Sequence, residues 1–244
     1  MPSTILHCVA LRTVRYSDRH SILTAYSAEA GRVSLLVPAG GGRGAARIRA
    51  LTMPMGVLEC VVDLKAGRDI YPFKDLTADA SCLQGDYGHP VRGVLGFFLA
   101  DFFYQTLKEP MADAEAFGLV RDTSRLLWTG PERGLANLHL LTMVRAATVY
   151  GIRPDTTTAA PGRFFDMAAG VWHNDVTLYG RHCLNAERSE AAQTLLRITP
   201  HNYHLFRFNR TQRAEAVDTM VEYFRLHGFE RLDSDVVKVL GELL

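Results

Sequence analysis

The sequence has few cysteines and no long hydrophobic run. Its cysteines lie far apart, and none belongs to a C-x-x-C pair: Cys8, Cys60, Cys82 and Cys183. This spacing excludes the usual zinc-ribbon and dithiol redox motifs and favours buried thiols. No stretch approaches the roughly 18 apolar residues of a membrane helix. The first eight residues lack the basic and apolar segments of a secretory signal, so we expect a cytoplasmic protein.

Motifs of nucleotide-dependent and hydrolytic enzymes are also missing. No G-K-[ST] sequence follows the glycine-rich stretch, and no G-x-G-x-x-G, H-E-x-x-H or G-x-S-x-G motif occurs. His201 and His204 stand three residues apart and could bind a metal if they lie on a helix, but no third ligand is evident. The sequence therefore predicts neither an enzyme nor a cofactor, and a nucleotide-dependent enzyme is disfavoured.

Acidic residues are scarce at the front of the chain. The formal net charge of the 244 residues is only +1, yet residues 1–55 hold seven arginines against Asp18 and Glu29. The remainder is mildly acidic. This distribution indicates that anion binding, if the protein has it, is concentrated in the N-terminal part.

The most basic segment is 39–49, which contains four glycines, three arginines and no acidic residue. Glycine adopts backbone angles that other residues avoid, so the composition predicts a mobile loop between strands. Arginine presents a planar fork of donors that suits phosphate, and such a loop could clamp a polyanion. A solvated, disordered connection is the alternative interpretation.

Short β-rich segments separated by turn residues occupy 5–14, 22–27, 32–37, 56–64 and 70–73. Five strands within about 75 residues predict a small closed barrel of the OB type over residues 1–76. OB barrels bind oligonucleotides with a cationic groove and stacked aromatic rings. Tyr16 and Tyr26 are the stacking candidates, although either could be a residue of the barrel wall.

From residue 77 onward the hydrophobic spacing becomes helical. Segments 91–107, 114–128 and 135–150 carry apolar stripes, and the first is apolar on more than one side, which predicts a buried helix. Residues 164–172 predict a small hairpin turning at Ala169-Gly170. Asn185, Asn209 and Ser234 can cap further helices. The fold class is therefore α+β, with a helical domain over residues 77–244 that holds one β-hairpin.

This layout and several short segments resemble one family. They are 11–16, 21–24 and 31–33 in the front strands, 54–59, 98–109, 164–167 with 170–172, and 223–229. Their order along nearly the whole chain resembles the bacterial recombination-mediator family RecO, in the form found in Bacteroidetes-like bacteria. The resemblance implies an OB domain followed by a helical domain, and no enzymatic turnover.

The resemblance also implies partners and contacts. The family binds single- and double-stranded DNA, anneals complementary strands, and works with RecR to load recombinase onto strands coated by single-strand-binding protein, whose acidic C-terminal tail it contacts. A nucleoid-associated location in the cytoplasm follows. With Tyr16, the expected DNA-binding residues are the arginines of the barrel that match the family by position: Arg12, Arg15, Arg19, Arg43, Arg47 and Arg49.

Two further expectations concern the helical domain. Many family members hold zinc with four cysteines there, but only Cys82 and Cys183 fall in this part of the chain, so no zinc is predicted. A pocket for the acidic tail should pair an apolar hollow with a basic residue, and the candidates are Arg121, Arg125, Arg207, Arg210 and Arg225. A protein-interaction adaptor with only secondary DNA contact is the alternative function.

Overall fold

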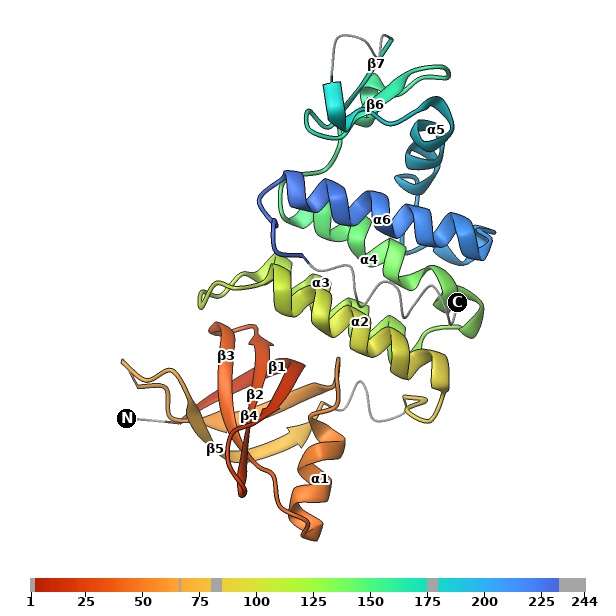
Figure 1. Cartoon of the computed structure of the whole chain (residues 1–244). Helices are drawn as coiled ribbons and strands as arrows, with labels where there is room; N and C mark the ends of the chain where they lie inside the picture. The colour runs from red at the N-terminus through yellow and green to blue at the C-terminus, as the bar shows by residue number, and fades with distance from the viewer. Residues whose placement is uncertain (1–2, 66, 80–84, 175–179, 233–244) are drawn as a thin grey trace. The chain divides into compact units, whose positions relative to one another are not determined.

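The structure is a computed structural model that describes residues 3–65, 67–79, 85–174 and 180–232 (Figure 1). Its internal contacts divide the chain into two compact units, Met1–Pro131 and Glu132–Leu244. The first unit contains the strands of the N-terminal part and three helices. The second contains the remaining helices and a hairpin.

A closed five-stranded barrel forms the front of the first unit. Its strands are β1 (Thr4–Arg15), β2 (His20–Ser27), β3 (Gly31–Pro38), β4 (Val57–Val62) and β5 (Tyr71–Ala78). The order around the barrel is β1-β2-β3-β5-β4, and β4 pairs with β1 to close it. Only the β3–β5 pairing is parallel. This is the OB topology, and it confirms the predicted fold class.

Alternating side chains fill the barrel. In β3, Val33, Leu35 and Val37 point inward and are buried, while their neighbours along the strand are partly exposed. Leu6 and Leu23 meet them from the adjoining strands. The period of two in the sequence therefore corresponds to one buried and one outer face, as expected for a strand with a single core face.

The predicted mobile loop at 39–49 is wrong for most of its length, because α1 (Arg43–Leu51) occupies it. Only Ala39 to Gly42 stay outside regular structure before the helix begins. Arginine, alanine and leucine are strong helix formers, and they outnumber glycine from residue 43 onward. Ala45 and Ile48 are buried on one face, and α1 contacts β3 and β5, so tertiary packing stabilises a short helix.

Helices α2 (Pro90–Thr106) and α3 (Ala114–Thr129) complete the first unit. The prediction that α2 is a buried helix fits most of its length, although Phe97 is 65% exposed. Both helices contact the barrel. Met55, whose φ is +62°, uses its carbonyl oxygen to accept hydrogen bonds from Ser124 Oγ and, at 2.9 Å, from Trp128 Nε1.

The second unit is helical with one small hairpin. It contains α4 (Leu135–Val149), α5 (Ala186–Leu195), α6 (Arg210–Leu226), β6 (Phe164–Asp166) and β7 (Val171–His173), with short 3-10 turns at Glu132–Gly134, Thr156–Thr158, Gly180–His182 and Tyr203–Leu205. The hairpin turn contains Gly170, whose φ is +69°. Phe165 and Trp172 stack across the hairpin with ring centroids 4.3 Å apart.

The helix starts follow the predicted caps. Asn185 accepts a hydrogen bond from the Arg188 amide, and Asn209 forms a capping box with Gln212. The helix predicted after Ser234 lies outside the described residues. The predicted boundary between residues 76 and 77 falls within β5 and stays a prediction.

The thiols that the structure describes fit the expected buried state at two positions. Cys8 and Cys60 are buried in the barrel, whereas Cys183 is partly exposed. Burial raises the pKa of the Cys60 thiol to about 12, which makes it a poor nucleophile. Cys82 lies outside the described residues.

Candidate nucleic-acid interface

Four of the predicted contact residues lie in or beside the β1–β2 hairpin, and all are exposed: Arg12, Arg15, Tyr16 and Arg19. The turn is closed by the Tyr16 amide, which donates to the His20 carbonyl at 3.0 Å. Arg15 Nη2 lies 2.9 Å from Asp18 Oδ1, with the two side chains 72% and 98% exposed. An ion pair this exposed is weak, so Arg15 can exchange Asp18 for a phosphate at little cost.

The other three predicted residues, Arg43, Arg47 and Arg49, extend from α1 and are exposed. The helix has no acidic residue. Arg49 Nη1 donates to the Gly40 carbonyl at 2.8 Å, which ties this side chain to the segment before the helix. Arg43 and Arg47 are four residues apart and share the helix face opposite the buried Ala45 and Ile48.

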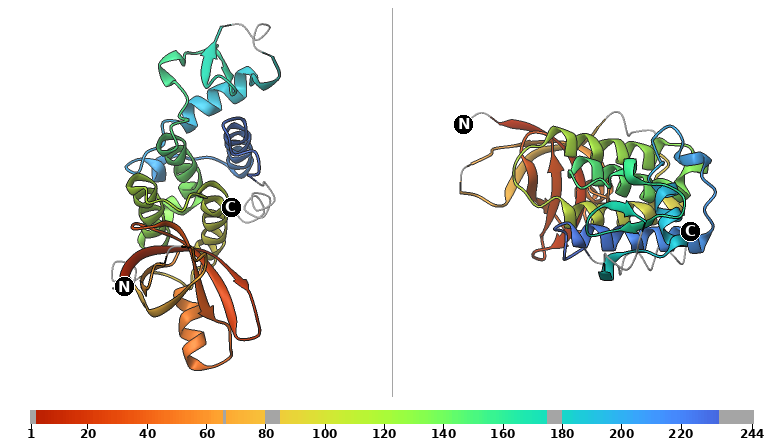
Figure 2. Two further views of the ribbon diagram at one scale, coloured as in Figure 1. Left: turned by 90° about the vertical axis from the view of Figure 1, so that its left-hand side faces the viewer. Right: turned by 90° about the horizontal axis from the view of Figure 1, so that it is seen from above.

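One arginine of each group contacts the segment between β3 and α1. The Ala39 amide donates to the Arg19 carbonyl at 2.9 Å, so the β1–β2 turn runs beside this connection. Arg49 Nη1 donates to the carbonyl of the next residue, Gly40. Figures 1 and 2 show α1 set against the barrel, away from α2 and α3. In the described part of the chain, no carboxylate lies within salt-bridge distance of Arg19, Arg43 or Arg47.

Arg12 is engaged elsewhere. Its guanidinium carbon lies 4.9 Å from the centroid of the Tyr104 ring, and that of Arg32 lies 4.2 Å from it. Arg32 also donates to the carbonyls of Tyr104 and Leu107. Sequence reasoning gave no signal for this cluster, because Tyr104 comes from α2, about 90 residues beyond Arg12 and about 70 beyond Arg32. Arg12 is therefore a less available cation than the arginines of the hairpin turn and α1.

Tyr16 and Tyr26, the two stacking candidates, differ in exposure. Tyr16 is 65% exposed, whereas Tyr26 is 3% exposed and its pKa is raised by burial and by Asp113. Tyr26 is thus a residue of the barrel wall, one of the two alternatives that the sequence left open. Tyr16 stands beside Arg15 and Arg19, where a base could stack on its ring.

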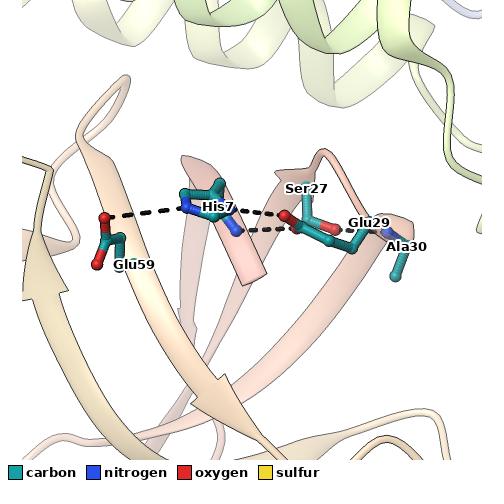
Figure 3. Close-up of polar contacts among 5 residues, drawn as sticks. All are labelled: His7, Ser27, Glu29, Ala30 and Glu59. Atoms are coloured by element: carbon teal, nitrogen blue, oxygen red, sulfur yellow. Dashed lines mark hydrogen bonds and ion pairs between the residues drawn. The ribbon is translucent and has the colours of Figure 1, made fainter. Parts of the chain in front are cut away.

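Another part of the barrel carries acidic groups (Figure 3). His7 Nδ1 lies 2.6 Å from Glu29 Oε1, and His7 Nε2 lies 3.9 Å from Glu59 Oε1. The hydrogen bond to Glu29 is the main cause that raises the pKa of His7. Glu29 also accepts a hydrogen bond from the His7 amide at 2.9 Å. A polyanion would be repelled here, so the charges of the barrel favour the face with the arginines.

The candidate residues for an acidic tail are not brought together. Arg121 and Arg125 lie on α3 in the first unit, while Arg207, Arg210 and Arg225 lie in the second. Arg121 is 3.6 Å from Asp122, and Arg225 Nε donates to the Leu232 carbonyl at 2.8 Å. None of these five is among the described residues that line the hollow between α5 and α6.

That hollow has an empty volume of about 590 Å³, part of it open solvent, and Arg188 is its basic residue. Leu195, Phe208 and Ala216 supply apolar surface. Arg188 Nη2 donates to Thr219 Oγ1 at 3.0 Å, while its buried Nε has no hydrogen-bond partner among the described atoms. Sequence reasoning missed Arg188, since a single arginine in the first turn of a helix resembles ordinary surface charge.

The described residues were also compared with the requirements of a metal site and of a membrane-spanning helix. His204 lies in a 3-10 turn, and no group of three or more His, Cys, Asp or Glu side chains is placed to hold a metal ion within the described ranges. In those same ranges, no helix combines the length and the apolar character required to cross a bilayer.

Comparison with known proteins gives a consistent result. Residues 1–79 match the family described as "Recombination protein O N terminal". The chain is 32% identical to the DNA repair protein RecO of Porphyromonas gingivalis, over 91% of each chain. It is 29% identical to that of Phocaeicola vulgatus, over 95% of this chain and 96% of the relative. Similarity of this extent, together with the OB barrel, shows that the chain belongs to the RecO family of DNA repair proteins.

Proposed function

We propose that this protein is a DNA-binding recombination mediator. It binds single- and double-stranded DNA through the barrel arginines, anneals complementary strands, and with RecR helps load recombinase onto strands coated by single-strand-binding protein. It turns over no substrate and works in the cytoplasm at the nucleoid. The observation that carries the proposal is that the β1–β2 turn and α1 both contact the segment Ala39–Gly40, and that Arg19, Arg43 and Arg47 have no carboxylate partner in the described residues.

Annealing needs charge but no leaving group. Two strands repel each other through their phosphates, and a cationic surface that contacts both lowers this repulsion. Each phosphate neutralised by arginine releases condensed counterions, so the logarithm of the affinity for single strands falls with the logarithm of salt by about 0.7 per contact. Such a surface holds DNA by its backbone and is indifferent to sequence.

The test replaces Arg43, Arg47 and Arg49 together by Ala. We expect affinity for single strands to fall about tenfold or more at low salt, and the salt slope to become shallower by roughly 2. Fluorescence anisotropy of a labelled oligonucleotide across several salt concentrations measures both quantities. The matched control replaces three exposed arginines of the second unit, Arg133, Arg181 and Arg197, by Ala, which changes the net charge equally. An unchanged slope in the α1 variant, or equal losses in both variants, would contradict the proposal.

The second candidate function is an adaptor that binds partner proteins, with DNA contact secondary. The α5–α6 hollow favours it: its lining combines apolar side chains with Arg188 and Glu215, and the Arg188 guanidinium suits one carboxylate of a peptide that ends in an apolar side chain. Within the mediator function, the same hollow serves as the site for the tail of single-strand-binding protein. Arg188→Ala should weaken binding of an acidic tail peptide and leave DNA affinity intact. A pull-down of partner proteins that survives high salt, together with no DNA binding at low salt, would favour the adaptor.

A further inference from the structure

A second hollow lies where α1 ends. Its empty volume is about 930 Å³, part of it open solvent, which is in the size range of ligand pockets. It is set between the end of α1, the start of β4, the end of β5 and the segment before α2. The described residues that line it are almost all apolar: Ala50, Leu51, Met53, Gly56, Val57, Ala78 and Tyr87.

Tyr87 is the aromatic member of this lining, and its ring is held in place. The ring lies on Trp128 with centroids 4.8 Å apart. On Gly85, a Cβ atom would lie 2.8 Å from the Tyr87 ring, so the chain comes as close there as glycine allows. The Tyr87 amide donates to the Gly85 carbonyl at 3.1 Å. The residue is nevertheless 39% exposed, which leaves ring surface open to a ligand.

Cationic side chains lead to this hollow along α1. Arg43 and Arg47 share the exposed face of the helix, and Ala50 and Leu51 occupy the next turn of that side. Residues four apart on a helix have Cβ atoms roughly 5–6 Å from each other, so Arg47 stands beside Leu51 at the rim. The nearby Asp86 is paired with Arg92 at 4.0 Å, which offsets its negative charge.

We infer that this hollow receives an unpaired base of a DNA single strand whose phosphates lie on Arg43 and Arg47. The inference rests on the proposed DNA binding and adds a second, base-dependent contact to it. A cationic row that ends at an apolar, aromatic hollow matches the two parts of a nucleotide, the charged phosphate and the flat base. A neutral peptide would leave the arginines without a partner. In duplex DNA the bases are stacked within the helix, so only a single strand can enter.

The lining also determines the selectivity. Apart from the hydroxyl of Tyr87, the side chains described around the hollow offer no hydrogen-bonding groups. The hollow therefore accepts a base by stacking and by excluding water, and it tolerates any sequence. This contact would favour single strands over duplexes, which the arginines alone, acting on phosphates, do not.

The experiment compares three DNA probes of equal length by anisotropy: a thymidine oligonucleotide, an abasic oligonucleotide with the same phosphates, and a duplex. In Tyr87→Ala, affinity for the thymidine strand should fall about fivefold or more, while affinity for the other two changes less than twofold. Tyr87→Phe, which keeps the ring, should retain the wild-type preference. Equal loss on all three probes, or no loss on any, would overturn the base contact.

Cross-linking of the wild-type protein gives an answer that does not depend on a variant folding. A single strand carrying 5-iododeoxyuridine cross-links on irradiation to aromatic rings that contact the base. We expect the cross-linked peptide to contain Tyr87, and cross-links found only at Tyr16 would overturn the inference. The two proposals also fail separately. If the α1 arginine variant leaves binding unchanged, the proposed function fails, whereas a weakened α1 variant with a neutral Tyr87→Ala removes only the base site.

Discussion

Replacing Gly31 by Ala tests how the barrel is joined to the segment after α2. Gly31 has a φ of +61°, and a Cβ atom there would lie 2.3 Å from the Met111 carbonyl oxygen and 2.7 Å from its nitrogen. Both atoms belong to backbone, so they cannot rotate away as a flexible side chain would. The next amide, that of Arg32, donates to the Glu109 carbonyl at 3.2 Å, and this hydrogen bond would have to shift as well.

The magnitude follows from two separate costs. A left-handed backbone conformation costs an L residue roughly 1–2 kcal/mol. Displacing the Met111 backbone adds the loss of at least one backbone hydrogen bond, about 0.5–1.5 kcal/mol, together with lost packing. Gly67→Ala is the matched control, because Gly67 has a φ of +77° but nothing within 4 Å of the added Cβ. We therefore expect Gly31→Ala to lower the free energy of unfolding by about 1–3 kcal/mol more than Gly67→Ala.

The chain has two tryptophans, and this allows a unit-specific assay. In a Trp172→Phe background, Trp128 is the remaining tryptophan and reports on the unit that contains the barrel. Urea unfolding followed by its emission gives the free energy for each variant. If the two glycine variants lose the same stability, the close approach of Met111 to Gly31 does not contribute, and the reasoning is refuted.

Three further predictions concern stability and protonation. His139 is buried, and desolvation followed by Arg213 lowers its pKa to about 3. Because the unfolded state binds a proton below pH 6.5, we expect the folded state to lose about 2–3 kcal/mol between pH 6.5 and 4.5, and urea titrations of His139→Gln should show a smaller loss. The pKa of His7 is raised by Glu29, so its stabilising effect is complete below pH 6.5 and is lost as pH rises through the folded value. Glu29→Gln should lower that pKa in an NMR titration, and an unchanged value would exclude this cause. Asn209→Ala removes the capping box of α6 and should cost about 1 kcal/mol in urea unfolding, whereas an unaltered midpoint would show that the cap is dispensable.

Local rules predicted most of the elements. The barrel strands follow a period of two, and α5 and α6 begin after the predicted asparagine caps, which accept hydrogen bonds from amides of the first helical turn. These signals act within a few residues, so they can be read from the chain. The same is true of Gly170, whose positive φ places the turn of the hairpin.

What the sequence could not decide depends on distant contacts. Glycines in 39–49 suggested a loop, but Ile48 gains enough burial in the barrel core to stabilise a helix. Tyr26 is covered on the outside of the barrel near Asp113, the cap of α3, about 90 residues away. Arg12 is drawn to Tyr104 in the same way. Hydrophobic spacing in a strand cannot reveal a helix that packs later against its outer face.

The presence of α1 in place of a loop changes the physical basis of the proposed DNA binding. Arginines on a mobile loop would lose conformational freedom on binding, and each ordered long side chain costs about 0.5–1.5 kcal/mol in addition to the backbone entropy of the loop. On α1 the backbone is already ordered, because Ala45 and Ile48 anchor the helix to the barrel. Arg49 is further restrained by the Gly40 carbonyl. The helix thus presents its cations at fixed spacing before any ligand arrives. In the proposed DNA binding, these arginines would act with less entropic loss than arginines on a loop.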